Sequence, residues 1–162
     1  MKIVEETQFG PQVEALLAEH LEQMSAGSPA ESMHALALDE MQSDDITVWS
    51  MWSPGYCGDD LLMGLGALKV LSAQHGELKS MRTSVQFLRQ GVAATLLNRI
   101  VREATARGYL RLSLETGSMA SFQPAVALYK KYGFSECDPF ADYQPDPNSL
   151  FLTKSLDGQS TS

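Results

Sequence analysis

Three features are scarce or missing in this 162-residue sequence, and each absence excludes a class of protein. The two cysteines, Cys57 and Cys137, lie far apart, so we expect free thiols rather than a disulfide framework. The longest uninterrupted apolar run, residues 61–68, falls well short of the roughly 20 residues that a membrane-spanning helix needs. The N-terminal residues MKIVEETQFG lack the apolar segment of a secretory signal. These absences predict a cytoplasmic protein with no membrane partner.

Basic residues are also scarce. The chain has 12 Lys and Arg against 20 Asp and Glu, which gives a formal net charge of −8. A protein that binds duplex nucleic acid needs a cluster of basic residues to displace counterions, and the sequence contains none, so we expect no nucleic-acid partner. An acidic surface attracts cationic small molecules such as amines, although solubility alone is the more frequent reason for it. The histidines and cysteines show no metal-ligand spacing, so no metal site is predicted.

What the sequence does have is the hydrophobic periodicity of one α/β domain. Hydrophobic residues make up 44% of the chain and charged residues 20%, as in an average globular domain of this length. The periods predict helices at 11–24, 28–41, 91–107 and 124–132, and strands at 46–52, 61–71, 77–83, 109–115, 134–137 and 149–155. We expect a turn at 74–76, one domain over residues 1–156, and a frayed polar tail at 157–162.

The segment 81–97 is the most informative part of the chain. It predicts a strand end, a short loop, and then a helix that begins at Gly91 with no acidic residue in its first turns. Free N–H groups at such a helix start carry partial positive charge and suit phosphate oxygens. Gly91 has no side chain to keep a ligand from the backbone, and Arg89 adds a cation. An ordinary strand-to-helix connection explains the pattern equally well, and the spacing of a P-loop is absent.

The same segment resembles the acyl-CoA pyrophosphate loop of the GNAT acetyltransferase superfamily. That loop has Arg or Gln, two residues, Gly, one residue, then Gly or Ala, and here the chain reads LRQGVA over residues 88–93. Downstream, AVALYKKYGF at 125–134 resembles the family's Leu-Tyr…Gly-Phe helix. The chain departs from the family pattern at Leu88, the first loop position, and at Phe122, where many relatives have Asn. Stretches such as ELKSMRT and PFADY resemble small bacterial members of mostly unassigned acceptor.

The resemblance implies a GNAT-like fold, with helices on both faces of a mixed central sheet. It also implies that the strands ending at Thr83 and Glu115 splay apart to form the acyl-CoA cleft. Acetyl-CoA would be the cosubstrate, with no metal, and a primary amine of a small-molecule acceptor would attack directly in a ternary complex. The expected cofactor-binding residues, by main chain or side chain, are Met81, Thr83, Leu88, Arg89, Gln90, Gly91, Val92, Ala93, Ala94 and Thr95.

Two residues are candidates for proton transfer. The resemblance makes Tyr129 the general acid that protonates the leaving thiolate, although a core aromatic on a helix is the alternative. Glu77 is the candidate base, because strict alternation places it on one strand face with Met81 and Thr83. A solvated glutamate at a strand start explains Glu77 nearly as well, and Glu115 is the reserve base.

The acceptor pocket is less well defined by the sequence. His34, Glu115, Asp142 and Tyr143 are candidate substrate contacts, although a structural role is the simpler explanation for His34. Two other function classes remain open: a non-catalytic domain that binds or senses acyl-CoA, and an acetyltransferase that acts on a protein N-terminus or lysine. The sequence leaves the acceptor unidentified and a homodimer open.

Overall fold

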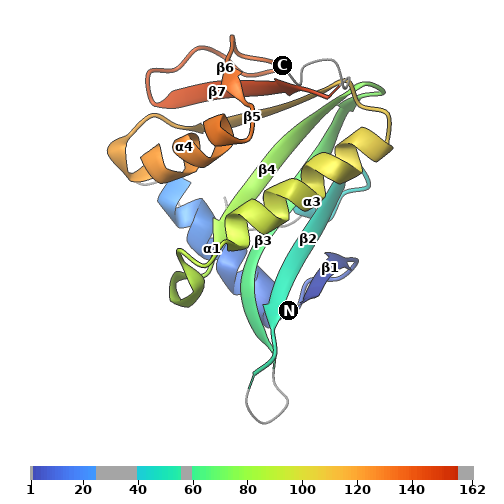
Figure 1. The fold of residues 1–162 in the computed structure, drawn as a ribbon, viewed down its shortest axis with the longest axis vertical. Helices are drawn as coiled ribbons and strands as arrows, with labels where there is room; N and C mark the ends of the chain where they lie inside the picture. The colour runs from blue at the N-terminus through green and yellow to red at the C-terminus, as the bar shows by residue number, and fades with distance from the viewer. Residues whose placement is uncertain (1, 25–39, 56–59, 157–162) are drawn as a thin grey trace. The chain divides into compact units, whose positions relative to one another are not determined.

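The computed structural model describes residues 2–24, 40–55 and 60–156 (Figure 1). The chain divides into two compact units, of which unit 1 comprises Met1–Leu68 and Ser80–Ile100, and unit 2 comprises Lys69–Lys79 and Val101–Ser162. Seven strands are hydrogen-bonded in the order β1-β2-β3-β4-β5-β7-β6, and β3 and β4 contribute residues to both units. β4 and β5 are parallel, whereas β5 and β7 are antiparallel, so the sheet is mixed. The predicted α/β class is confirmed.

Most predicted elements are present, with small shifts at their ends. The strands are β1 (Lys2–Glu6), β2 (Ile46–Ser53), β3 (Leu61–Ser72), β4 (His75–Thr83), β5 (Arg111–Gly117), β6 (Ser135–Glu136) and β7 (Ser149–Ser155). The helices are α1 (Pro11–Met24), α3 (Val92–Ala106) and α4 (Gln123–Lys131), with 3-10 turns at Val85–Phe87 and Ala120–Phe122. The sequence analysis missed β1, and His75, predicted in a turn, begins β4. Most of the helix predicted at 28–41, and the tail at 157–162, lie outside the described residues.

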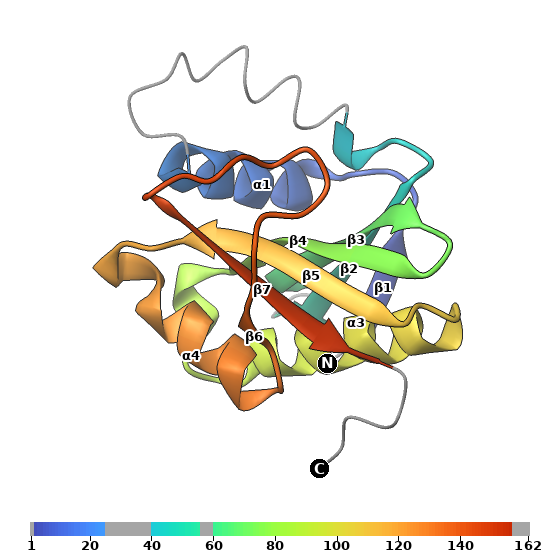
Figure 2. The same ribbon diagram turned by 90° about the horizontal axis from the view of Figure 1, so that it is seen from above.

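Unit 1 packs a helix against each face of its strands. On one face Leu16 and Leu17 of α1 form a buried cluster with Leu65 of β3, and each such leucine contributes roughly 1.5–3 kcal/mol relative to an exposed one. On the other face a Cβ at Gly64 would lie 2.8 Å from Val92 Cγ1 of α3. Gly64 therefore lets α3 approach the strand closely. Figure 2 shows α1 and α3 on opposite sides of β2 and β3.

Unit 2 is organised around β5. It pairs with β7 from Arg111–Ser155 to Gly117–Ser149, and with the start of β4 from His75–Arg111 to Leu78–Leu114. Val126 and Tyr129 are the buried residues of α4, and Phe134 lies in the core just after that helix. In Figure 2, α4 and the middle of the β6–β7 connection lie on opposite sides of β5 and β7. This connection brings residues 141–143 to the start of β4.

Candidate active site

The loop between β4 and α3 has an unusual backbone. Leu88 is extended, with φ −61° and ψ 148°, but Arg89 and Gly91 have φ of 63° and 80°, in the left-handed region that favours glycine. A non-glycine residue such as Arg89 costs about 1–2 kcal/mol in this conformation. A Cβ at Gly91 would meet nothing within 4 Å, so packing does not require a glycine there. The backbone conformation favours it, and the space outside Gly91 is open.

The first turn of α3 presents N–H groups. Its hydrogen-bond ladder begins where Thr95 N donates to Gly91 O at 3.0 Å, so the N–H groups of Val92, Ala93 and Ala94 have no acceptor inside the helix. The first turn contains no acidic residue, and Val92 is buried, which fixes the helix start against β3. The three residues before Gly91 are exposed: Leu88, Arg89 and Gln90. Unit 1 thus offers oriented N–H groups beside a cation, an arrangement suited to phosphate.

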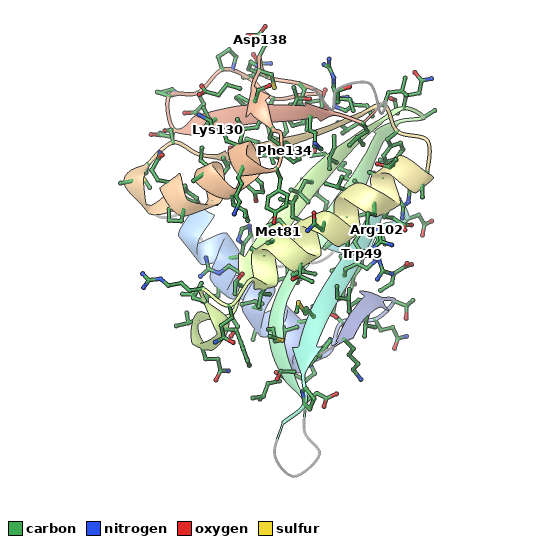
Figure 3. The ribbon with its side chains drawn as sticks, in the orientation of Figure 1. Trp49, Met81, Arg102, Lys130, Phe134 and Asp138 are labelled. Atoms are coloured by element: carbon green, nitrogen blue, oxygen red, sulfur yellow. The ribbon has the colours of Figure 1, made fainter. Side chains whose placement is uncertain are left out.

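The end of β4 departs from a regular strand. Ser80 has φ 56°, so counting by twos from Glu77 does not fix the side on which Met81 and Thr83 lie. Within unit 1, a Cβ at Gly66 would lie 2.5 Å from Met81 Sδ and 2.8 Å from Ile100 Cδ1, so the Met81 side chain lies on the α3 side of β3 (Met81 is labelled in Figure 3). The next residue, Arg82, forms an ion pair with Glu19 of α1 at 2.8 Å. The predicted shared face of Glu77, Met81 and Thr83 therefore loses its basis, because that argument assumed an unbroken extended backbone.

Unit 2 contains a cavity of about 600 Å³. It lies between the end of β3, the start of β4 and the β6–β7 connection, and is lined by Lys69, Val70, Leu71, Ser72, His75, Glu77, Ala141, Asp142 and Tyr143. Three residues predicted for the site thus line one cavity: Glu77 from β4, and the adjacent Asp142 and Tyr143 from the β6–β7 connection. The size is typical of a pocket for a small molecule.

Glu77 is the central side chain of this cavity. It is only 3% exposed, and the Tyr143 hydroxyl donates a hydrogen bond of 2.6 Å to its Oε2. Burial raises the pKa of the Glu77 carboxyl, and nearby Glu115 adds to this effect, whereas the Tyr143 hydrogen bond and the charges of Lys79 and Lys69 oppose it. A carboxylate with a raised pKa is a better proton acceptor than an ordinary surface glutamate. The alternative of a solvated glutamate at a strand start is wrong.

Aromatic rings hold Tyr143 in place. Its ring lies 5.2 Å from that of Phe140 and 5.5 Å from that of Phe151, centroid to centroid, in edge-on and tilted arrangements. His75, which also lines the cavity, lies 5.9 Å from Phe140 and shares a 2.7 Å hydrogen bond with Ser113. Burial lowers the pKa of His75, assisted by the nearby charge of Arg111, so the imidazole is neutral at pH 7. The sequence analysis did not select His75, Phe140 or Phe151 for the site.

Tyr129 occupies a buried position on α4. It is 7% exposed, and its ring meets that of Phe134 edge-on at 5.8 Å (Phe134 is labelled in Figure 3). Phe134 N donates to Tyr129 O at 3.0 Å across Gly133, whose φ is 97°. The residues of the Leu-Tyr…Gly-Phe signature therefore also have a structural role: they end α4 and pack Phe134 against Tyr129. Burial raises the pKa of the Tyr129 phenol well above its usual value, so the hydroxyl stays protonated at physiological pH.

The remaining candidates have other surroundings. Glu115 accepts a hydrogen bond of 2.7 Å from Ser149 Oγ, and His34 lies outside the described residues. The ring of Phe122 packs on Gly117, where a Cβ would overlap it, so this departure from the family's Asn fills space at the end of β5.

Within the described part of the chain, no group of three or more His, Cys, Asp or Glu residues is arranged to hold a metal ion. None of the described helices is both long enough and apolar enough to cross a membrane.

The loop, the helix signature and the mixed sheet are the features that the resemblance to the GNAT superfamily implies. The sequence matches the model of the Acetyltransferase (GNAT) family over residues 13–134. The chain therefore belongs to the GNAT family and is an acetyltransferase.

Three comparisons show where the chain lies among similar proteins. It is 56% identical to the N-acetyltransferase YsnE of Bacillus subtilis (strain 168), over 91% of this chain and 94% of that protein. It is 36% identical to the IAA acetyltransferase of Azospirillum brasilense, over 79% of this chain and 80% of that protein. A crystal structure from Klebsiella pneumoniae, described as an acyl-CoA N-acyltransferase, has a TM-score of 0.76 and 28% identity, over 96% of this chain and 97% of that one.

Proposed function

We propose that the protein transfers the acetyl group of acetyl-CoA to a primary amine of a small molecule, by direct attack in a ternary complex. The observation that carries this proposal is the cavity of unit 2, whose lining includes the buried Glu77 and the exposed Asp142. A volume of about 600 Å³ suits a small molecule. The two carboxyl groups of the lining outnumber its lysine, Lys69, and this balance favours a cationic ammonium group. That a 36% identical relative is named an IAA acetyltransferase also supports a small acceptor.

The loop of unit 1 is proposed to hold acetyl-CoA. The N–H groups at the start of α3, next to Gly91, would bind the pyrophosphate, and Arg89 would add an attractive charge. Leu88, Gln90 and Thr95 complete this proposed set; Thr95 Oγ1 donates to Gly91 O at 2.8 Å, so its role is to close the first turn. By family resemblance, main-chain groups of Met81 and Thr83 would pair with the pantetheine amides. No metal has a role in this proposal.

Glu77 is proposed as the general base. An acceptor amine with a pKa near about 10 is mostly an ammonium ion at pH 7 and must lose a proton before it attacks. Since Oε2 of Glu77 accepts the Tyr143 hydrogen bond, Oε1 is the oxygen left to receive this proton. The nitrogen then forms a bond to the acetyl carbon, the bond from that carbon to the CoA sulfur breaks, and the nitrogen loses its second proton to solvent as the amide forms.

Tyr129 is proposed as the acid that protonates the departing sulfur. Its phenol is protonated at physiological pH, as that of an ordinary tyrosine is, so a proton is present when the thiolate forms. Burial raises the pKa of this phenol further and makes it a weaker acid, so the thiolate must draw the proton from a reluctant donor. A thiol has a pKa near about 8.5, so the thiolate leaves readily and needs only modest help.

Release of CoA thiol tests this function. The purified protein and acetyl-CoA are mixed with a panel of small primary amines, and with peptides that offer a free N-terminus or a lysine as matched acceptors. We expect sustained thiol release with at least one small amine and an acetylated amine in equal amount by mass spectrometry. Tight binding of acetyl-CoA without thiol release would instead identify a sensing domain, and release with peptides alone would identify a protein acetyltransferase.

A further inference from the structure

The further inference concerns Tyr143 and rests on the proposed role of Glu77. The hydrogen bond from the Tyr143 hydroxyl joins residues 66 positions apart, at a distance of 2.6 Å from oxygen to oxygen. We propose that Tyr143 is the positioning residue of this enzyme's base: it fixes the Glu77 carboxyl so that one oxygen stays free for the acceptor amine. The sequence analysis had predicted Tyr143 only as an acceptor contact.

The geometry supports positioning because both partners are held. Glu77 is 3% exposed and lies on β4 where that strand pairs with β5, its Cα opposite Ser113. The Tyr143 ring packs against the rings of Phe140 and Phe151, which also contact each other at 5.9 Å, so it belongs to a cluster of three rings that holds its phenol. A buried carboxylate that accepts a hydrogen bond from a fixed donor loses rotational freedom and keeps its second oxygen in one place.

The same hydrogen bond makes the base usable at lower pH. A donor to the ionised carboxylate favours the charged form, so it lowers the pKa of Glu77 against the effect of burial. Within the part of the chain that the structure describes, the other charged and titratable groups around Glu77 are Lys69 of β3, His75 and Lys79 of β4, Glu115 of β5, and Asp142 of the β6–β7 connection. A Tyr143→Phe change leaves all of these in place, so its effect reports the hydroxyl alone.

Tyr143→Phe is the direct test, because it retains the ring and its aromatic neighbours. The deletion raises the pKa of Glu77, so Glu77 is protonated over a wider range of pH. We expect the acidic limb of the kcat/KM profile to move up by about one pH unit, with about tenfold lower activity at the acidic end. The deficit shrinks at higher pH, where Glu77 ionises without help. Tyr132→Phe, on a tyrosine outside the cavity, is the matched control and leaves the profile in place.

Two further measurements separate this inference from the proposed function. In a Glu77→Gln background the Tyr143→Phe change has no further effect on kcat/KM if Tyr143 acts through Glu77. A carboxyl-carbon NMR titration reports the pKa of Glu77 in the resting protein, with its signal assigned by its loss in Glu77→Gln. This readout holds even if no acceptor is found. An unchanged Glu77 titration in Tyr143→Phe, or a rate deficit that is equal at every pH, overturns the positioning role.

Discussion

The two units contribute different kinds of chemical group to the proposed reaction. In unit 1 the loop at 88–91 and the start of α3 offer main-chain N–H groups, and the residues before Gly91 are exposed. In unit 2 the cavity offers side chains, with a buried carboxyl group held by a phenol. A site built from backbone tolerates changes of side chain, whereas a site built from side chains does not. Since unit 1 is proposed to bind the cofactor and unit 2 to transfer protons, changes of side chain in unit 2 should lower the rate. Cofactor affinity should fall only with changes that alter the backbone or the charge of the unit 1 loop.

The largest effect is expected at Glu77. Glu77→Gln keeps the size of the side chain and removes the base, so kcat/KM at pH 7 should fall by roughly 100- to 10,000-fold. The deficit should narrow toward about pH 9–10, because the free amine becomes abundant near its own pKa. Initial rates across this pH range check the prediction. A deficit that stays constant across pH assigns Glu77 to positioning and makes Glu115 the next base to test.

The next effect is expected at Tyr129. Tyr129→Phe keeps the ring against Phe134 and deletes only the hydroxyl, so kcat should fall by roughly 10- to 1,000-fold while the melting temperature changes little. Acetyl-CoA affinity should change by no more than a few-fold, because the proposed cofactor site consists of the N–H groups at the start of α3 in unit 1. Single-turnover rates beside a thermal melt check both parts. Full activity across pH 6–9 would show that water protonates the thiolate and that Tyr129 serves packing alone.

Gly91→Asp tests the backbone site with a negative charge. It places a carboxylate where the pyrophosphate is proposed to lie, so acetyl-CoA affinity should fall by at least about tenfold, or about 1.4 kcal/mol. Gly91→Asn is the matched control, since asparagine has nearly the same shape, tolerates positive φ and carries no charge. Calorimetry should show a much smaller loss for Gly91→Asn. Equal losses in the two variants would assign the effect to backbone conformation rather than to charge.

The smallest effect is expected at Leu88. It is 52% exposed, so Leu88→Arg restores the family's first loop residue without disturbing the core. An exposed cation near a phosphate adds up to about 1 kcal/mol, so acetyl-CoA should bind only a few-fold more tightly. A gain well above tenfold would mean that side chains, not backbone, dominate this site. Titration at low and at physiological salt would show the screening expected of an exposed charge.

The difference between the units also explains which parts of the candidate site could be predicted from the sequence and which could not. The loop of unit 1 is contiguous, so its glycine, its exposed neighbours and the helix after it can be recognised together in one stretch. Glu77 is predicted from the alternation of side chains along an extended strand. The backbone of Ser80, with φ 56°, breaks that alternation between Glu77 and Met81. The Glu77–Tyr143 hydrogen bond joins residues 66 positions apart, and no local pattern encodes it.

Local patterns also failed where pairing decides the structure. β1 is five residues long, and its strand conformation depends on antiparallel pairing with β2 from Lys2–Trp52 to Glu6–Val48. His75 was predicted in a turn because it lies between Gln74 and Gly76. It is a strand residue because it pairs with Arg111 of β5, which is far along the sequence.

The division between cofactor binding and catalysis is tested most directly by calorimetry of acetyl-CoA with Gly91→Asp and Glu77→Gln side by side. Circular dichroism of both variants confirms that each is folded. The account predicts that Gly91→Asp loses at least about tenfold in affinity, while Glu77→Gln binds within a few-fold of the unaltered protein. Unchanged affinity in Gly91→Asp, or an equal loss in Glu77→Gln, would contradict it.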